Sequence, residues 1–215
     1  MTFGKSSGSR SLRLPAAFLT WLFLSGSAPM SMAQAAPPSA REGSPGWTVE
    51  QLLESLAKNQ LAEVRFEETA SSDLLTQPLK TQGILRFIPP TGLEKHITAP
   101  YDERYLVEGD TVLVESKTKG TNRTLSLHDY PALRGFIEAF RSTLANDVIT
   151  LRRWYSVTLQ GEPQRWVLVL RPLDNDVRAL VESIRFSGER ERVSRIEIRA
   201  PDGDRSVMVI ATGAP

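Results

Sequence analysis

Two groups of residues have types and spacings that could support catalysis, and both are incomplete. Ser55 and Lys58 have the S-x-x-K spacing of a serine nucleophile, but the companion S-D-N and K-T-G patterns are missing from the chain. His96 and the pair His128-Asp129 could supply a base and an orienting acid, yet neither has a convincing nucleophile nearby in the sequence. We therefore expect both histidines to be polar residues of loops or strand edges.

The sequence gives no more support for a metal or cofactor site than for a catalytic one. The chain has no cysteine and only two histidines, which excludes a thiolate site and argues against a histidine-based zinc site. The acidic groups Asp102-Glu103 and Asp174 with Asp176 lack the glycine and the terminal glutamate of a calcium loop. Neither G-x-x-x-x-G-K-[ST] nor G-x-G-x-x-G occurs. We expect no metal, no cofactor and no enzymatic activity, with a Ser55/Lys58 hydrolase as the least favoured alternative.

The overall composition is that of an ordinary soluble domain. Hydrophobic residues make up 40% and charged residues 24% of the 215 residues. The 26 Lys and Arg nearly balance the 25 Asp and Glu, so the chain lacks the positive charge of a nucleic-acid-binding protein. We expect no nucleic-acid partner.

The first residues have the order of a secretory signal peptide. Lys5, Arg10 and Arg13 precede an apolar stretch at 14–26, and Ser31-Met32-Ala33 supplies a small-x-small cleavage pattern. The apolar run is too short for a comfortable membrane span, and no other stretch approaches the required length. We predict export through the Sec pathway to the periplasm of a Gram-negative bacterium, with cleavage near Ala33.

The remaining chain divides into a lead-in and one domain. Residues 34–46 are rich in Ala, Pro, Ser and Gly and are expected to be a flexible lead-in after the signal peptide at 1–33. Residues 47–215 show neither an internal repeat nor a second boundary, so they form a single domain.

Hydrophobic periodicity predicts a mainly β domain with a few helices. Helical spacing occurs at 47–60, where Thr48 and Gln51 form a capping box, and again at 131–145. A short helix capped by Asp174 is predicted at 174–180. Alternation with a period of two, interrupted by turn signals, predicts about eleven short antiparallel strands. Their ranges are 64–70, 82–88, 93–99, 103–108, 111–117, 122–127, 154–160, 165–171, 181–186, 193–199 and 206–212.

The helix at 131–145 has a wide apolar face. Leu133, Phe136, Ile137, Phe140 and Leu144 share one stripe, and the polar positions, Arg141 among them, are expected to face away. The strands supply further large apolar side chains. They could form a plain core, with the helix plugging a curved sheet, or they could line an apolar cavity that accepts acyl chains.

Sequence motifs between residues 83 and 112 point to a family. The stretch 83–93 (GILRFIPPTGL) resembles the G-x-L-x-F/L…P…L/F pattern of LolA-type periplasmic lipoprotein carriers. Residues 96–100 (HITAP) resemble the H-x-T-x-P segment of that family, and residues 102–112 (DERYLVEGDTV) resemble its D-E…L-V-x-D-G-x-T-L segment. Phe66 and Glu68 fall where the family commonly has F-x-Q, and the order of elements matches over most of 47–212.

The resemblance implies an α+β, mainly β fold, an unclosed antiparallel β-barrel of about eleven strands with covering helices. It also implies a monomeric carrier that shuttles acylated lipoproteins, or another lipid cargo, from an inner-membrane exporter to an outer-membrane acceptor. The residues expected to bind the acyl chains are Phe66, Leu85, Phe87, Tyr105, Val112, Phe136, Phe140, Trp166 and Leu168.

One departure from the family pattern bears on how the cargo is handled. The family usually carries an arginine next to the proline that follows the G-x-L strand, and that arginine is associated with lid opening and cargo release. Ile88-Pro89-Pro90 has none, which indicates a divergent branch whose cargo is a lipoprotein or another lipidated product. The alternative on the same fold is a periplasmic sensor of lipids or lipoproteins, similar to anti-sigma-factor accessory proteins.

Overall fold

A single antiparallel sheet of eleven strands runs through the computed structural model, which describes residues 47–58 and 63–211. The predicted signal peptide at 1–33 and the lead-in at 34–46 lie outside the described residues. The first six strands are β1 (Glu63–Ser71), β2 (Leu79–Ile88), β3 (Gly92–Ala99), β4 (Glu103–Glu108), β5 (Thr111–Ser116) and β6 (Thr121–Ser126). The last five are β7 (Tyr155–Glu162), β8 (Arg165–Pro172), β9 (Ser183–Glu189), β10 (Arg192–Arg199) and β11 (Arg205–Ile210).

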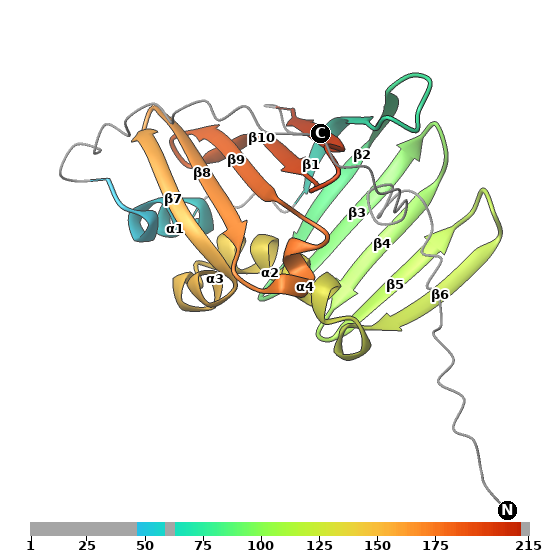
Figure 1. Cartoon of the computed structure of the whole chain (residues 1–215), viewed down its shortest axis with the longest axis horizontal. Helices are drawn as coiled ribbons and strands as arrows, with labels where there is room; N and C mark the ends of the chain where they lie inside the picture. The colour runs from blue at the N-terminus through green and yellow to red at the C-terminus, as the bar shows by residue number, and fades with distance from the viewer. Residues whose placement is uncertain (1–46, 59–62, 212–215) are drawn as a thin grey trace, which may run out of the picture.

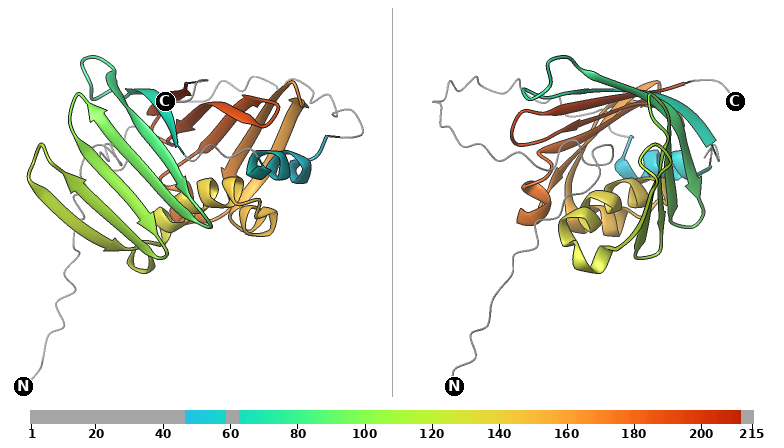
Figure 2. Two further views of the ribbon diagram at one scale, coloured as in Figure 1. Left: turned by 180° about the vertical axis from the view of Figure 1, so that it is seen from behind. Right: turned by 90° about the vertical axis from the view of Figure 1, so that its right-hand side faces the viewer.

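The sheet curves strongly but does not close. Its strand order is β6-β5-β4-β3-β2-β1-β11-β10-β9-β8-β7, so the two strand groups join where β1 pairs with β11 and the ends, β6 and β7, stay unpaired with each other. Figure 1 shows the two groups side by side, and the right-hand view of Figure 2 shows the sheet arching over the helices. The predicted unclosed antiparallel barrel of eleven strands with covering helices is confirmed.

The helices lie on the concave face of this sheet (Figure 2). They are α1 (Val49–Lys58), α2 (Pro131–Leu144), α3 (Val148–Trp154) and α4 (Asn175–Arg178), with a 3-10 turn η1 (Leu127–Asp129) before α2. The predicted caps are confirmed: the Thr48 and Gln51 side chains each accept a hydrogen bond from the other's backbone N–H, and the Asp174 carboxylate accepts from two backbone N–H groups of α4. Helix α3 was not predicted.

Helix α2 packs closely on its neighbours around Gly135. Helices α1 and α3 contact β7, α4 contacts β8, and α2 packs on α3 and α4. A Cβ atom at Gly135 would lie 2.3 Å from Val177 of α4 and 2.9 Å from the Trp154 ring, so only glycine allows this approach. The Tyr155 hydroxyl at the start of β7 donates to the Gly135 carbonyl at 2.8 Å and fixes α2 against the sheet.

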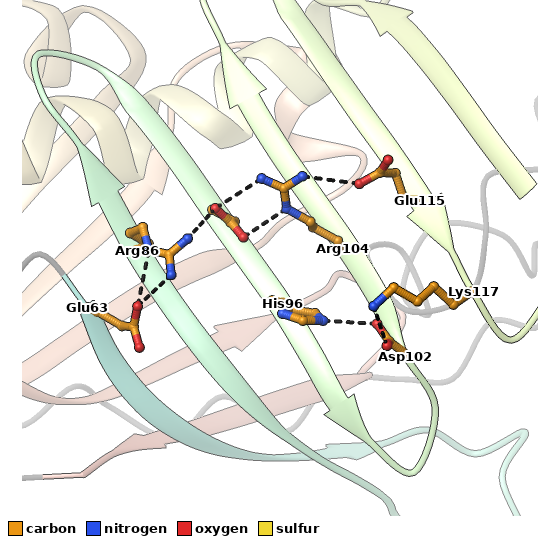
Figure 3. A network of polar contacts seen from close by, with 8 residues as sticks. Glu63, Arg86, His96, Asp102, Arg104, Glu115 and Lys117 are labelled. Atoms are coloured by element: carbon orange, nitrogen blue, oxygen red, sulfur yellow. Dashed lines mark hydrogen bonds and ion pairs between the residues drawn. The ribbon is translucent and has the colours of Figure 1, made fainter. Parts of the chain in front are cut away.

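A ladder of alternating charges crosses the convex face of β1–β5 (Figure 3). Arg86 donates to Glu63 on one side and to Glu94 on the other. Arg104 then donates to both Glu94 and Glu115. The Glu94 carboxylate is nearly buried between the two guanidinium groups, and its hydrogen bonds from Arg104 outweigh burial and hold the pKa of Glu94 below its ordinary value.

Candidate functional site

The nine residues predicted to bind acyl chains all project toward the concave face. Across the first strand group, cross-strand pairing places Leu85 beside Lys95, Lys95 beside Tyr105, and Tyr105 beside Val114. Because directly opposite residues of neighbouring strands point to the same face of a sheet, these residues share one face. Trp166 and Leu168 project to the same face from β8, which is separated from β1 by three strands in the sheet order.

The nine residues divide into two groups by burial. Five are fully buried in the hydrophobic core, as in the plain-core interpretation: Phe66, Tyr105, Val112, Trp166 and Leu168. The other four remain partly exposed: Leu85 and Phe87 on β2, and Phe136 and Phe140 on α2. These four are the members of the predicted set that can offer apolar surface to a ligand without unpacking the core.

This division follows two regions of the concave face. In the sealed region, the inward side chains of β8 and β9 are all buried: Trp166, Leu168, Leu170, Ile184 and Phe186. In the open region, four inward side chains of β2 and β3 remain partly exposed: Leu85, Phe87, Leu93 and Lys95. The open region is therefore the candidate ligand-binding surface.

Helix α2 connects the two regions through aromatic contacts. The rings of Phe136 and Phe140 meet edge to face with their centroids 5.2 Å apart. Phe140 meets Phe186 of β9 in the same way at 5.5 Å. The helix thus rests on the sealed region through Phe140, and both phenylalanine side chains remain partly exposed.

The prediction that the Arg141 side chain faces away from the protein is wrong, because this side chain links α2 to the first strand group. Arg141 is buried instead of facing away. Its guanidinium donates from Nε to the Thr91 carbonyl at 2.9 Å and from Nη2 to the Gly109 carbonyl at 2.6 Å. These two carbonyls lie in the β2–β3 and β4–β5 turns, so Arg141 ties the last turn of α2 to the first strand group. The available signal was the position of Arg141 one turn after Ile137, at the edge of the apolar stripe.

This contact also qualifies the departure noted at Ile88-Pro89-Pro90. The turn that follows those prolines has no arginine of its own, but its Thr91 carbonyl receives a guanidinium from α2. An arginine therefore joins helix and turn here, with the side chain supplied by the helix. Glu138 lies 3.5 Å from the same guanidinium and balances its charge.

A polar band crosses the concave face beside the open region. Glu68 accepts hydrogen bonds from Lys95, Thr81 and Ser206. Burial by itself would raise the pKa of Glu68, but Lys95 and the two hydroxyl donors outweigh it and hold the pKa below its ordinary value.

A second carboxylate, Glu103, extends this band. It is buried and accepts from the Tyr105 and Ser116 hydroxyls and from the Lys119 ammonium. Nearby, burial and the charges of Glu103 and Glu68 raise the pKa of Tyr101 to about 12, so this phenol stays protonated at neutral pH. The burial of Glu68 and Glu103 was not expected, because strand alternation alone does not distinguish a solvated glutamate from a buried one.

Two of the residues with catalytic spacing, Lys58 and His96, have carboxylate partners in the structure. Lys58 pairs with Glu54 one turn earlier at 2.7 Å, and both side chains are exposed. His96 lies on the convex face, where its Nε2 contacts Asp102 at 2.9 Å (Figure 3). Within residues 47–58 and 63–211, His, Cys, Asp and Glu form no group of three that could hold a metal ion. No helix of these ranges is long and apolar enough to cross a membrane.

A separate groove of about 560 Å³ lies between η1, α2 and α3. None of the nine predicted residues lines it, and its walls are polar and apolar in similar measure. The lining residues are Leu127, His128, Pro131, Arg134, Glu138, Thr150, Arg153 and Trp154.

The family comparison decides the relationship that the fold suggests. Residues 42–215 match the family described as outer membrane lipoprotein carrier protein LolA-like. The chain belongs to this LolA-like family. None of the curated proteins matches its sequence.

Solved structures similar to this LolA-like chain share little sequence with it. A LolA superfamily protein from Nitrosomonas europaea is 13% identical, with 79% of this chain and 96% of that chain covered and a TM-score of 0.43. A putative outer membrane lipoprotein-sorting protein domain from Vibrio parahaemolyticus is 10% identical, with 78% and 93% covered and a TM-score of 0.41. The MucA/MucB complex of Pseudomonas aeruginosa contains a chain that is 11% identical, with 78% and 58% covered and a TM-score of 0.41.

Proposed function

We propose that this LolA-like protein is a non-enzymatic periplasmic carrier that holds acyl chains against the open region of its concave face. The cargo is a lipoprotein or another lipidated product, received from an inner-membrane exporter and passed to an outer-membrane acceptor. The protein acts as a monomer, after export and cleavage of the signal peptide.

The observation that carries this proposal is the set of apolar side chains left partly exposed beside a sealed core. Leu85, Phe87 and Leu93 offer apolar area on the sheet, and Phe136 offers it on α2. Each methylene group of an acyl chain gains about 0.8 kcal/mol when it leaves water, so a chain of ordinary length needs such a surface to cross an aqueous compartment.

The proposed mechanism depends on the connection between α2 and the first strand group. Helix α2 is held to that group by the hydrogen bonds of Arg141 to two turn carbonyls. Polar contacts of this kind can be exchanged for contacts with water, whereas the packing of α2 on α3 and α4 buries apolar surface. Cargo entry therefore breaks the two Arg141 hydrogen bonds and moves the C-terminal end of α2 away from the β2–β3 and β4–β5 turns.

The proposal is tested by binding of a tripalmitoylated cysteinyl peptide to the purified mature protein, followed by native mass spectrometry. The wild type is expected to take up one lipopeptide. Leu85→Ser removes apolar surface from the open region and is expected to weaken binding about fivefold, because roughly 1 kcal/mol of apolar contact is lost. Leu113→Ser is the matched control, since Leu113 is a half-buried strand leucine on the convex face.

Two results would contradict the carrier proposal. One is the absence of any bound lipopeptide in the wild type under conditions where the protein is folded. The other is equal weakening by Leu85→Ser and Leu113→Ser, which would show that binding does not depend on the concave face. A protein that binds no lipid but copurifies with a membrane-bound regulator would support the sensor alternative.

A further inference from the structure

The concave face contains an ion pair among side chains that are otherwise apolar. Lys95 Nζ lies 2.5 Å from Glu68 Oε2, and only 16% and 13% of the two side chains remain exposed. The same ammonium lies 5.3 Å from the centroid of the Phe66 ring. In the cross-strand register, Lys95 stands between Leu85 and Tyr105, within the row of residues expected to bind acyl chains.

The two partners differ in their remaining hydrogen-bonding capacity. Glu68 accepts from Ser206 at Oε1 and from Lys95 and Thr81 at Oε2, so both of its oxygens have donors. A lysine ammonium has three N–H donors, and Glu68 takes one of them. Among the described residues, the Phe66 ring is the other contact of this ammonium, which leaves it able to donate to an additional acceptor.

The remaining N–H donors of Lys95 favour an oxyanion as that acceptor, because a hydrogen bond between two charged groups is stronger than one between neutral groups. The attraction between opposite charges strengthens as water is excluded, and Lys95 is largely withdrawn from solvent. The other buried carboxylate of the band, Glu103, already accepts from Tyr105, Ser116 and Lys119. The hydrogen-bond donors that remain available on this part of the face therefore belong to a cationic group. Such a group binds an oxyanion and not an amine.

We propose that Lys95 is the polar anchor of the ligand site and binds an oxyanion, phosphate or carboxylate, at the polar end of an acyl-chain amphiphile. The acyl chain lies along Leu85, Phe87 and Leu93, and Glu68 holds the ammonium in place. This inference rests on the proposed carrier function and adds the head-group class that the site selects.

The test compares probes that share one acyl chain and differ in charge. Palmitoyl lysophosphatidic acid and monopalmitoylglycerol have the same glycerol and acyl chain, and palmitate with methyl palmitate forms the carboxylate pair. Dissociation constants are measured by calorimetric titration of the wild type, Lys95→Met and Lys117→Met. Lys117 is the matched control because it forms a lysine–carboxylate pair with Asp102 on the convex face.

The wild type is expected to bind an anionic probe about tenfold more tightly than its uncharged partner, as a charge-assisted hydrogen bond in a partly buried site provides. Lys95→Met is expected to remove this preference, so that the charged and uncharged probes of a pair bind equally, whereas Lys117→Met retains the preference. The double variant Lys95→Met/Glu68→Gln gives the same result without an unpaired buried carboxylate, so misfolding of the single variant does not block the test. Phosphate and carboxylate anchoring are distinguished by which pair shows the preference.

The outcomes separate this proposal from the carrier proposal. If the wild type binds charged and uncharged probes equally, or if the double variant keeps the preference, the anchor is overturned while acyl binding stands. If the wild type binds none of the four probes and no lipopeptide, the carrier function fails and the anchor fails with it.

Discussion

The sealed and open regions of the concave face are built from the same sheet but are covered differently. On β8 and β9, Trp166, Leu168 and Phe186 are buried beneath helices that contact β7 and β8. On β2 and β3, Leu85 and Leu93 stay partly exposed. Chain connectivity accounts for part of the difference, because α2 and α3 immediately precede β7 and α4 connects β8 to β9.

The difference indicates that the two regions of the sheet have different roles. Residues in the sealed region stabilise the fold, since their apolar surface is satisfied by the protein itself. Residues in the open region contribute less to stability and keep surface available for a ligand. Surfaces with few internal contacts are those that open or bind at the lowest free-energy cost.

The largest expected effect comes from truncating matched leucines in the two regions. Leu168→Ala in the sealed region is expected to lower the free energy of unfolding by about 2–5 kcal/mol, because it leaves a cavity in a packed core. Leu85→Ala in the open region is expected to cost about 1 kcal/mol, because its side chain is partly exposed already. Urea denaturation measures both values.

Lipopeptide titration of the same two variants completes the comparison. Leu85→Ala should weaken lipopeptide binding more than Leu168→Ala does. Both variants are titrated without urea, at a temperature at which both are folded. Equal losses of stability in the two variants would show that the two regions are packed alike and would remove the basis of the comparison.

The second expected effect is the release of α2 from the open region. Arg141→Met is expected to lower the free energy of unfolding by about 2 kcal/mol, because the Thr91 and Gly109 carbonyls lose charge-assisted donors. Amide hydrogen exchange should accelerate in the last turn of α2 and in the two turns, while β8 and β9 keep their protection. Arg134→Met is the control on the same helix, as the Arg134 side chain is considerably more exposed.

An unchanged exchange rate at the end of α2 in Arg141→Met would contradict a latch role for this residue. A uniform acceleration over the whole chain would show a general loss of stability instead of a local release. The lipopeptide on-rate provides a further readout, since a released helix should admit the cargo faster.

Strand number and order of elements could be predicted from the sequence because they depend on local signals. Period-two alternation and turn residues such as Gly161 and Gly203, both with positive φ, set the hairpins wherever the rest of the fold places them. Helix α3 was not predicted, because Asn146 and Asp147 directly follow the predicted helix at 131–145 and are residue types typical of a helix end. Asp147 also caps α3 by accepting from the Thr150 backbone N–H, so two helices meet there.

The division of the candidate site could not be predicted, because it depends on where the helices dock. Phe66 and Phe87 have the same residue type and both face inward on neighbouring strands, yet one is buried and the other partly exposed. Arg141 was misplaced for a related reason: α2 is enclosed on more than one side, and the acceptors of Arg141 come from turns far away in the sequence. The acyl-binding role of the nine residues stays a prediction.

The third expected effect concerns the convex charge ladder behind the open region. Glu94→Gln is expected to cost about 1–2 kcal/mol at pH 7, because Arg86 and Arg104 lose the carboxylate that both contact. The folded-state pKa of Glu94 lies below its ordinary value, so its contribution is fully present above the unfolded-state pKa of about 4.3. It is lost as the pH falls through the lower folded-state pKa.

The stability difference between wild type and Glu94→Gln should therefore be constant near neutral pH and shrink in acid. Glu197→Gln is the matched variant on β10, where Glu197 pairs with Arg199 and Arg205 on the convex face of the second strand group. Exchange should accelerate in β2–β4 for Glu94→Gln and in β10 for Glu197→Gln. A pH-independent difference for Glu94→Gln would mean that charge contributes little to the ladder.

The smallest expected effect tests whether charge or apolar packing closes the sealed region. Arg152 on α3 pairs with Glu50 on α1 at 2.7 Å, and about half of each side chain is exposed. Exposed pairs of this kind contribute little, so Arg152→Met should change the free energy of unfolding by less than about 0.5 kcal/mol, and high salt should abolish the difference. A loss as large as that of Arg141→Met would show that surface charge holds α1 and α3 over β7, and the sealed region would then depend on ionic strength. A negligible loss leaves apolar packing as the force that closes this region and makes the polar contacts of Arg141 the part of the helix layer that can be exchanged during binding.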